Sequence, residues 1–253
     1  MTDDLRFRFV LPKPPEGPLV EMSAEEMEKL LVKRAETDKD PVEGLWQLAR
    51  FYQQSKNYEK GLACLRQILS RMPDAEGKAR TILGLGQMME SVGDYKAAVM
   101  YYKEALALEP SQTDVWYFIS NNLGFSLIQL SQFSEGATWC RRAIETNPNR
   151  ANAYKNLGMA LSGQGDFQGA ATCFVAATQV DAADPRAFKL LEELLQHHPE
   201  LEFEFRDRVD CCREAVQAVA KKAAQLKPVV YKGWRKQLIL MRENIRRFFR
   251  RKA

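Results

Sequence analysis

The chain has 253 residues and carries 37 Lys and Arg against 33 Asp and Glu, a net charge of +4. Its hydrophobic fraction of 45% is enough for a sizeable packed core. The sequence starts "MTDDLRFRF", with acids where a secretory signal carries bases, and no uncharged apolar run approaches the roughly 20 residues that span a bilayer. We therefore expect a cytoplasmic protein with neither a signal peptide nor a membrane-spanning segment.

Two segments precede the main body of the chain. Residues 1–22 hold four prolines between Pro12 and Pro18 and predict a flexible, Pro-rich arm. Ser23 and Glu26 stand three residues apart in a capping box, which predicts a helix from about Ala24 to Thr37. We therefore assign residues 23–39 to an N-terminal helix.

The next part of the chain repeats one pattern at Leu-to-Leu intervals of 37, 38 and 34 residues. Each copy has a Leu followed by a small residue, then an aromatic ten residues after the Leu, as in "YKNLGMALSGQGDFQGAATCF". The paired positions are Leu48-Ala49, Leu85-Gly86, Leu123-Gly124 and Leu157-Gly158, and the aromatics are Tyr58, Tyr95, Phe133 and Phe167. Such periodicity indicates stacked helical hairpins, because one hairpin cannot bury its own apolar face.

These copies resemble tetratricopeptide repeats, which share the Leu-Gly, aromatic, Ala, Phe and Pro positions. The four matching segments are 42–74, 79–111, 117–149 and 151–183, and 185–196 resembles the first helix of a fifth. The resemblance implies an all-α, right-handed solenoid of helix-turn-helix pairs, over about residues 40–199, with no β-sheet.

The repeats also predict where the chain turns. We expect turns near Lys56-Asn57, Gly93-Asp94, Ser131-Gln132 and Gly165-Asp166. The longest interval, the 38 residues that lead to the third repeat, predicts an extra turn at the beginning of the helix that holds Trp116 to Leu130.

A search for chemistry finds no catalytic arrangement. His197 and His198 precede a proline, which favours the end of a helix, where they can bond the last carbonyls. We interpret all five cysteines as reduced packing residues, and no ligand cluster has zinc spacing. We therefore predict neither enzyme activity, nor a metal, nor a cofactor.

The first helix of each repeat predicts the binding residues. The position before each Leu-Gly should face a concave groove, and amides there can both donate to and accept from a peptide backbone. The family resemblance implies this role for Asn122 and Asn156. The predicted peptide-binding set is Gln47, Asn121, Asn122, Lys155, Asn156, Arg186 and Lys189. Its bases favour an acidic partner, although these can also be ordinary surface residues, and the neighbours required to grip a chaperone's terminal carboxylate are incomplete.

The end of the chain is strongly basic. Residues 221–253 carry twelve Lys and Arg and one acid, a net +11, whereas the remainder carries 25 basic and 32 acidic residues, a net −7. Residues 200–253 predict a helical cap, with a break at Pro228 before a last amphipathic helix. Its apolar stripe is Trp234, Leu238, Met241, Ile245 and Phe248, and its basic face is Lys232, Arg235, Lys236, Arg246, Arg247 and Arg250.

The sequence therefore predicts a non-catalytic scaffold that binds an extended peptide in the groove of its repeats. The basic last helix leaves an alternative. It can cap the solenoid, bind an anionic membrane surface, or meet an acidic protein or, less favourably, a nucleic acid. The identity of the partner and the oligomeric state have no signal in the sequence.

Overall fold

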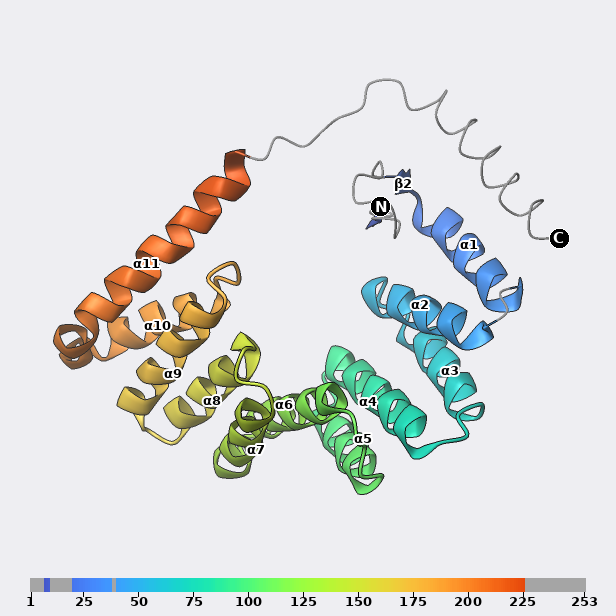
Figure 1. Ribbon diagram of the computed structural model, residues 1–253, viewed down its shortest axis with the longest axis horizontal. Helices are drawn as coiled ribbons and strands as arrows, with labels where there is room; N and C mark the ends of the chain where they lie inside the picture. The colour runs from blue at the N-terminus through green and yellow to red at the C-terminus, as the bar shows by residue number, and fades with distance from the viewer. Residues whose placement is uncertain (1–6, 10–19, 38–39, 226–253) are drawn as a thin grey trace.

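The chain forms a solenoid of paired helices that curves into an arch (Figure 1). The computed structural model describes residues 7–9, 20–37 and 40–225. In these residues the N-terminal helix is α1 (Ala24–Thr37). The repeat pairs are α2 (Pro41–Gln54) with α3 (Tyr58–Leu69), α4 (Ala75–Val92) with α5 (Tyr95–Ala107), α6 (Thr113–Gln129) with α7 (Phe133–Thr146), and α8 (Ala151–Gly163) with α9 (Phe167–Val180). The final elements are α10 (Arg186–His197), the 3-10 turn η1 (Pro199–Leu201) and α11 (Glu202–Gln225).

The predicted capping box is confirmed at the start of α1. The Ser23 backbone N–H donates to Glu26 Oε2 at 3.1 Å, and the Glu26 backbone N–H donates to Ser23 Oγ at 3.2 Å. These reciprocal bonds satisfy two amides that a helix start leaves without partners. Met27 and Leu31 then pack α1 onto α2, so α1 covers the first repeat.

All four predicted turns are present, and each contains a residue with positive φ. Gly93 and Gly165 take this conformation at φ of 88° and 83°, and Lys56 and Ser131 take it at 59° and 60°. Side chains of Asn57, Asp94 and Asp166 then accept hydrogen bonds from the first turn of the following helix. The sequence located these turns, although two of them use a residue with a side chain in place of glycine.

The long first helix of the third repeat is also confirmed. It begins at Thr113, and its first turn has no side-chain cap of its own. Glu76 of α4 supplies the missing acceptor, because its Oε2 accepts from the backbone N–H of Ser111 at 2.7 Å and of Gln112 at 3.3 Å. A carboxylate at this position also interacts favourably with the helix dipole.

The Leu-Gly pairs explain how closely the two helices of a pair approach. A Cβ added to Gly158 would lie 2.5 Å from the Phe174 ring, and one added to Gly86 would collide with the Tyr102 ring. Tyr102 and Phe174 are both fully buried in the seam between their helices. The small residue of the motif therefore makes room for the aromatic that recurs sixteen residues later.

One short feature departs from the expected all-helical pattern. Strands β1 (Phe7–Phe9) and β2 (Val20–Met22) pair antiparallel, with Phe7 opposite Met22. The sequence predicted no sheet and missed this pair, because three-residue strands have too little alternation to be recognised. The fold class of the body remains all-α.

The cysteines follow the packing interpretation with one exception. All five are free, and Cys64, Cys140 and Cys212 are buried, while Cys173 is half-buried. Cys211 is exposed, so the prediction that all five are packing residues is wrong there. Adjacent residues on a helix point in directions about 100° apart, so Cys211 and Cys212 could not both face the core. The predicted stripe and basic face of the last helix lie outside the described residues.

Candidate functional site on the inner face of the arch

The first helix of each pair lines the inside of the arch, and the second helix lies outside it (Figure 1). We call the side chains that α2, α4, α6, α8 and α10 present to this side the inner face. This arrangement brings six of the seven predicted site residues to α6, α8 and α10, while Gln47 lies on α2. The Gln47 side chain donates to Glu43 Oε1 at 2.9 Å within its own helix. It is therefore not brought together with the others.

Three asparagines form a continuous chain of amide hydrogen bonds between α8 and α6. Asn156 Nδ2 donates to Asn121 Oδ1 at 3.1 Å, and Asn121 Nδ2 donates to Asn122 Oδ1 at 3.0 Å. Asn156 and Asn121 are only 3% and 7% exposed, whereas Asn122 is half-buried. We call this chain the amide ladder. Its buried members connect two repeats, and only Asn122 has appreciable access to solvent.

The ladder leaves one acceptor without a partner. Asn156 Oδ1 is buried and accepts no hydrogen bond from the described residues. A buried polar atom without a partner costs about 1–3 kcal/mol. Such a cost indicates that the side chain is placed for something other than stability alone.

The predicted basic residues lie at the start of α8 and α10. The Arg186 guanidinium donates to Asp184 from Nε to Oδ1 at 2.8 Å, and its Nη2 also lies 3.4 Å from Asn152 Oδ1. The hydrogen bond from Arg186 lowers the pKa of Asp184 to about 2. Arg186 is therefore already paired with a carboxylate.

Two lysines beside this pair have no such partner. Lys155 is half-buried and Lys189 is exposed, and neither forms an ion pair with a carboxylate in the part of the chain that the structure describes. Burial, followed by the nearby charge of Arg186, lowers the pKa of Lys155. Both effects disfavour the ammonium form, so an incoming anion would be favourable at this position.

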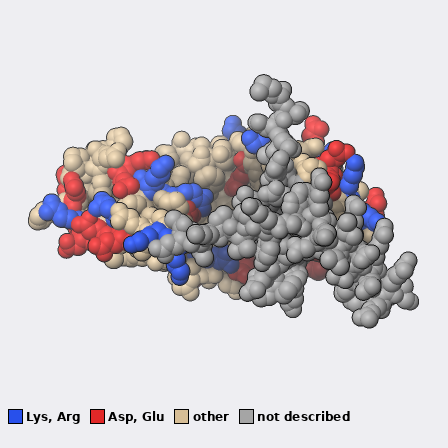
Figure 2. Space-filling view, turned by 90° about the horizontal axis from the view of Figure 1, so that it is seen from above, with Lys and Arg blue, Asp and Glu red and all other residues tan. Residues whose placement is uncertain are grey.

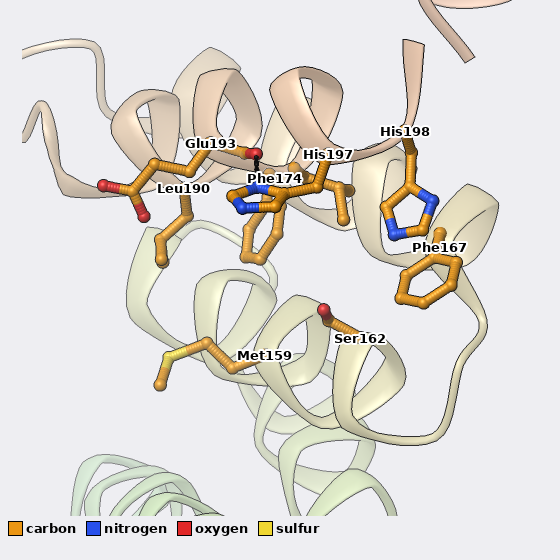
Figure 3. A pocket seen from close by; sticks show the side chains of 9 residues that line it. Met159, Ser162, Phe167, Phe174, Leu190, Glu193, His197 and His198 are labelled. Atoms are coloured by element: carbon orange, nitrogen blue, oxygen red, sulfur yellow. Dashed lines mark hydrogen bonds between the residues drawn. The ribbon is translucent and has the colours of Figure 1, made fainter. Parts of the chain in front are cut away.

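A cleft of about 440 Å³ opens between α8 and α10, one turn further along both helices. Its lining residues are Met159, Ser162, Phe167, Phe174, Leu190, Glu193, Leu194, His197 and His198. Figure 3 shows the His197 ring projecting over Phe174, between Leu190 and Ser162, with Met159 on the opposite side. The cleft therefore has an apolar floor and a few polar groups at its rim.

Both histidines occupy the predicted helix end. His197 is the last residue of α10, and its Nδ1 lies 2.7 Å from the Glu193 carbonyl oxygen. His198 stacks on Phe167 with ring centroids 3.6 Å apart, and its Nδ1 lies 3.0 Å from Glu200 Oε1. The sequence identified the helix end but gave no sign that these rings border a cleft.

A second polar group lies on the inner face near the ladder. Glu90 of α4 accepts a hydrogen bond from Ser126 Oγ of α6 at 2.7 Å. Burial raises the pKa of this carboxyl to about 7, against the opposing effect of the Ser126 bond. Sequence analysis did not single out Glu90, because a helical Glu is ordinarily solvated, and its burial depends on contacts with Tyr102 of α5 and Ser126 of the next repeat.

Among the described residues, no helix is long and apolar enough to cross a membrane, and no three His, Cys, Asp or Glu side chains gather as metal ligands. Charges of both signs are intermingled over the visible surface at the α11 end (Figure 2). The inner face therefore combines local polar groups with an apolar cleft.

Comparison with known proteins identifies the repeats. Sequence models described as tetratricopeptide repeat match residues 42–110 and 139–171. These two segments are tetratricopeptide repeats. Human tetratricopeptide repeat protein 7A is 25% identical over 145 residues, which are 57% of this chain and 16% of that protein. Photosystem I assembly protein Ycf3 of Prochlorococcus marinus is 31% identical over 104 residues, 40% of this chain and 58% of that protein.

Solved structures show the same fold. BtubC from P. vanneervenii has a TM-score of 0.62 at 19% identity, covering 83% of this chain and 93% of that one. MamA from Desulfovibrio magneticus RS-1 has a TM-score of 0.52 at 17% identity, covering 75% and 98%. The chain spans only 16% of the human relative's length, so the likeness extends to the repeats and not to that protein as a whole.

Proposed function

We propose that this chain is a non-catalytic scaffold whose inner face binds an extended, acidic segment of a partner protein across the third to fifth repeats. Tetratricopeptide repeats are protein-interaction units, and the assembly role in the name of Ycf3 is in keeping with such a function. The observation that carries the proposal is the pair Lys155 and Lys189. They form no ion pair in the described residues, and each stands four residues before a residue that lines an open cleft, Met159 and Glu193.

The charge argument concerns Lys155 first. Its ammonium is partly desolvated and lies near Arg186, whose own carboxylate partner is Asp184. A carboxylate from a partner would relieve this unfavourable environment. Charge-assisted hydrogen bonds of this kind are about twice as strong as neutral ones.

The amide ladder contributes a second type of contact. Asn121 occupies one acceptor position of Asn122 Oδ1 and thereby fixes the orientation of the Asn122 amide. The NH₂ group and the second lone pair of Asn122 can then bond the main chain of a peptide, whatever its sequence. Asn121 and Asn156 act as positioning residues in this proposal.

A display library of random 12-residue peptides, selected against the full chain, tests the proposal. We expect enrichment of acidic peptides, and we expect Lys155→Gln with Lys189→Gln to abolish that enrichment. Lys56→Gln with Lys96→Gln is the matched control, because it removes the same charge from exposed positions in the turn before α3 and on α5. Equal loss with both double variants would contradict a site on the inner face.

The alternative function, attachment to an anionic surface through the basic last helix, concerns residues outside the described part of the chain. It stays a prediction from the sequence. Vesicle sedimentation with anionic and zwitterionic lipids tests it separately from peptide selection.

A further inference from the structure

The cleft and the two unpaired lysines lie on the same pair of helices at a fixed separation. Lys155 and Met159 are four residues apart on α8, and Lys189 and Glu193 are four apart on α10. Four residues of an α-helix rise about 6 Å. Two residues of an extended peptide cover about 6.6 Å, and side chains two apart point to the same side.

We propose that the inner face reads a two-part motif, in which an acidic residue and a large aromatic residue stand two positions apart in the bound segment. The acid meets Lys155 and Lys189, and the aromatic enters the cleft between α8 and α10. This inference rests on the proposed function, because it assumes that an acidic segment binds the inner face. It adds that the segment, which crosses the repeats, follows the axes of α8 and α10 over the two residues that contact the lysines and the cleft. It adds a specific occupant for the cleft.

The lining of the cleft selects the aromatic residue. Phe174, Leu190 and Met159 provide apolar surface, and about 440 Å³ is ample for one aromatic side chain. Glu193 stands at the rim and forms no ion pair with the described residues. Its negative charge repels a carboxylate from the cleft, so the acidic residue of the motif stays at the lysines and the register is fixed.

His197 gives the cleft a preference among aromatic side chains. Its Nδ1 lies 2.7 Å from a backbone carbonyl, which only accepts, so Nδ1 carries the proton. In the neutral ring Nε2 is then an acceptor at the rim of the cleft. A tyrosine hydroxyl or a tryptophan N–H can donate to it, whereas phenylalanine leaves it without a partner.

The test extends the peptide selection with variants of the cleft. Met159→Trp fills the cleft and leaves both lysines in place, and Met100→Trp is its control because Met100 is 73% exposed on α5. Retained helical circular dichroism and melting temperature establish that each variant is folded. We expect the wild type and Met100→Trp to enrich an aromatic two positions from an acid. Met159→Trp should still enrich acids but lose the aromatic.

A peptide from the selection then allows the contribution of its aromatic residue to the binding affinity to be measured. Replacement of its aromatic residue by Ala should weaken binding to the wild type about tenfold, as measured by fluorescence anisotropy, and should weaken binding to Met159→Trp less than about twofold. His197→Phe should remove the preference for Tyr over Phe at that position. It should leave the preference for acid unchanged.

The outcomes separate the two proposals. Acidic peptides without an aromatic at fixed spacing would overturn the motif while the proposed function stands. The same aromatic enrichment with Met159→Trp would show that the aromatic binds elsewhere, which also overturns the motif. Absence of acidic enrichment in the wild type would overturn the proposed function and the motif with it.

Discussion

The two ends of the inner face use the same repeat positions in opposite ways. Between α2 and α4, Trp46 packs against Gly84, where an added Cβ would lie 2.9 Å from the indole ring. Between α8 and α10, the corresponding positions hold Lys155 and Leu190, and a cleft of about 440 Å³ lies one turn further along. An indole fills the gap at one end, and at the other the gap is left open beside unpaired charge.

The hydrogen bonding of polar groups differs between the same two ends of the inner face. At the α2 end, Gln53 Nε2 donates to Ser91 Oγ at 2.8 Å, and Gln47 bonds Glu43. At the α8 end, Asn156 Oδ1 has no hydrogen-bond partner in the described residues, and Lys155 and Lys189 form no ion pair there. Because the repeats share one backbone plan, this difference comes from a few side chains. A solenoid can therefore confine binding to part of its length.

Of the variants that test this comparison, Trp46→Ala should have the largest effect on stability. Removing the indole should lower the free energy of unfolding by about 3 kcal/mol, because burial is lost and a cavity remains between α2 and α4. Met159→Ala, which enlarges a gap that is already open, should cost less than about 1 kcal/mol. Urea denaturation of both variants checks this, and equal losses would mean that the two gaps are filled alike.

The close contacts at the Leu-Gly pairs should contribute equally to the free energy of unfolding at both ends of the solenoid. Gly86→Ala and Gly158→Ala should each lower the free energy of unfolding by about 2 kcal/mol, since the new methyl meets a buried ring in either case. Gly77→Ala is the control, because its methyl would meet the flexible Met72 side chain instead. If the control were as costly as the seam variants, loss of glycine itself, and not the ring contact, would be responsible.

Glu90 gives a pH-dependent prediction for the middle of the inner face. Its pKa of about 7 exceeds the ordinary value of 4.5, so the folded chain keeps a proton that the unfolded chain has released. The free energy of unfolding should therefore fall as pH rises from about 5 to 7. Glu90→Gln keeps an acceptor for Ser126, and at pH 8 it should be about 2 kcal/mol more stable than the wild type.

The matched control for this prediction is Glu104→Gln, since Glu104 is an exposed carboxylate on α5. Unfolding measured at pH 5, 7 and 8 should show that only the Glu90 variant loses the pH dependence. A variant that keeps the wild-type slope would indicate that other groups cause it.

Local rules account for the parts of the structure that the sequence predicted. The capping box at Ser23, the four turns and the Leu-Gly pairs each depend on residues close together in sequence or on a simple period. These features could be predicted without knowing how the repeats contact each other. Gly84 carried a signal that the sequence analysis did not use, because it is a glycine at a repeat position that elsewhere holds Asn or Gln, and in the structure Trp46 packs against it.

The site was harder to predict because it depends on contacts between repeats. The sequence placed Asn121 and Asn156 on the correct helices, yet their bond to each other joins residues 35 apart and turns both amides inward. The cleft is a sum of side-chain volumes from α8, α9 and α10, for which no motif exists. Pairing of Arg186 with Asp184 depends on the turn before α10, and it removes one of the predicted bases from free use.

That last pairing gives the smallest and most specific prediction. In Asp184→Asn the amide oxygen can still accept from the Arg186 backbone N–H, a bond of 3.1 Å in the wild type, while the ion pair is lost. Arg186 is largely exposed, and exposed ion pairs contribute about 0–1 kcal/mol, so stability should change little. The Arg186 guanidinium, no longer paired with a carboxylate, then adds its positive charge to those of Lys155 and Lys189. An acidic peptide from the selection should therefore bind about three- to fivefold more tightly, and the gain should shrink as salt rises. Asp210→Asn, which removes the same charge and one of the two carboxylate partners of Arg213 on α11, is the control and should leave binding unchanged. Equal gains with both variants would indicate attraction by net charge alone, and no gain with Asp184→Asn would place the acidic segment away from α10.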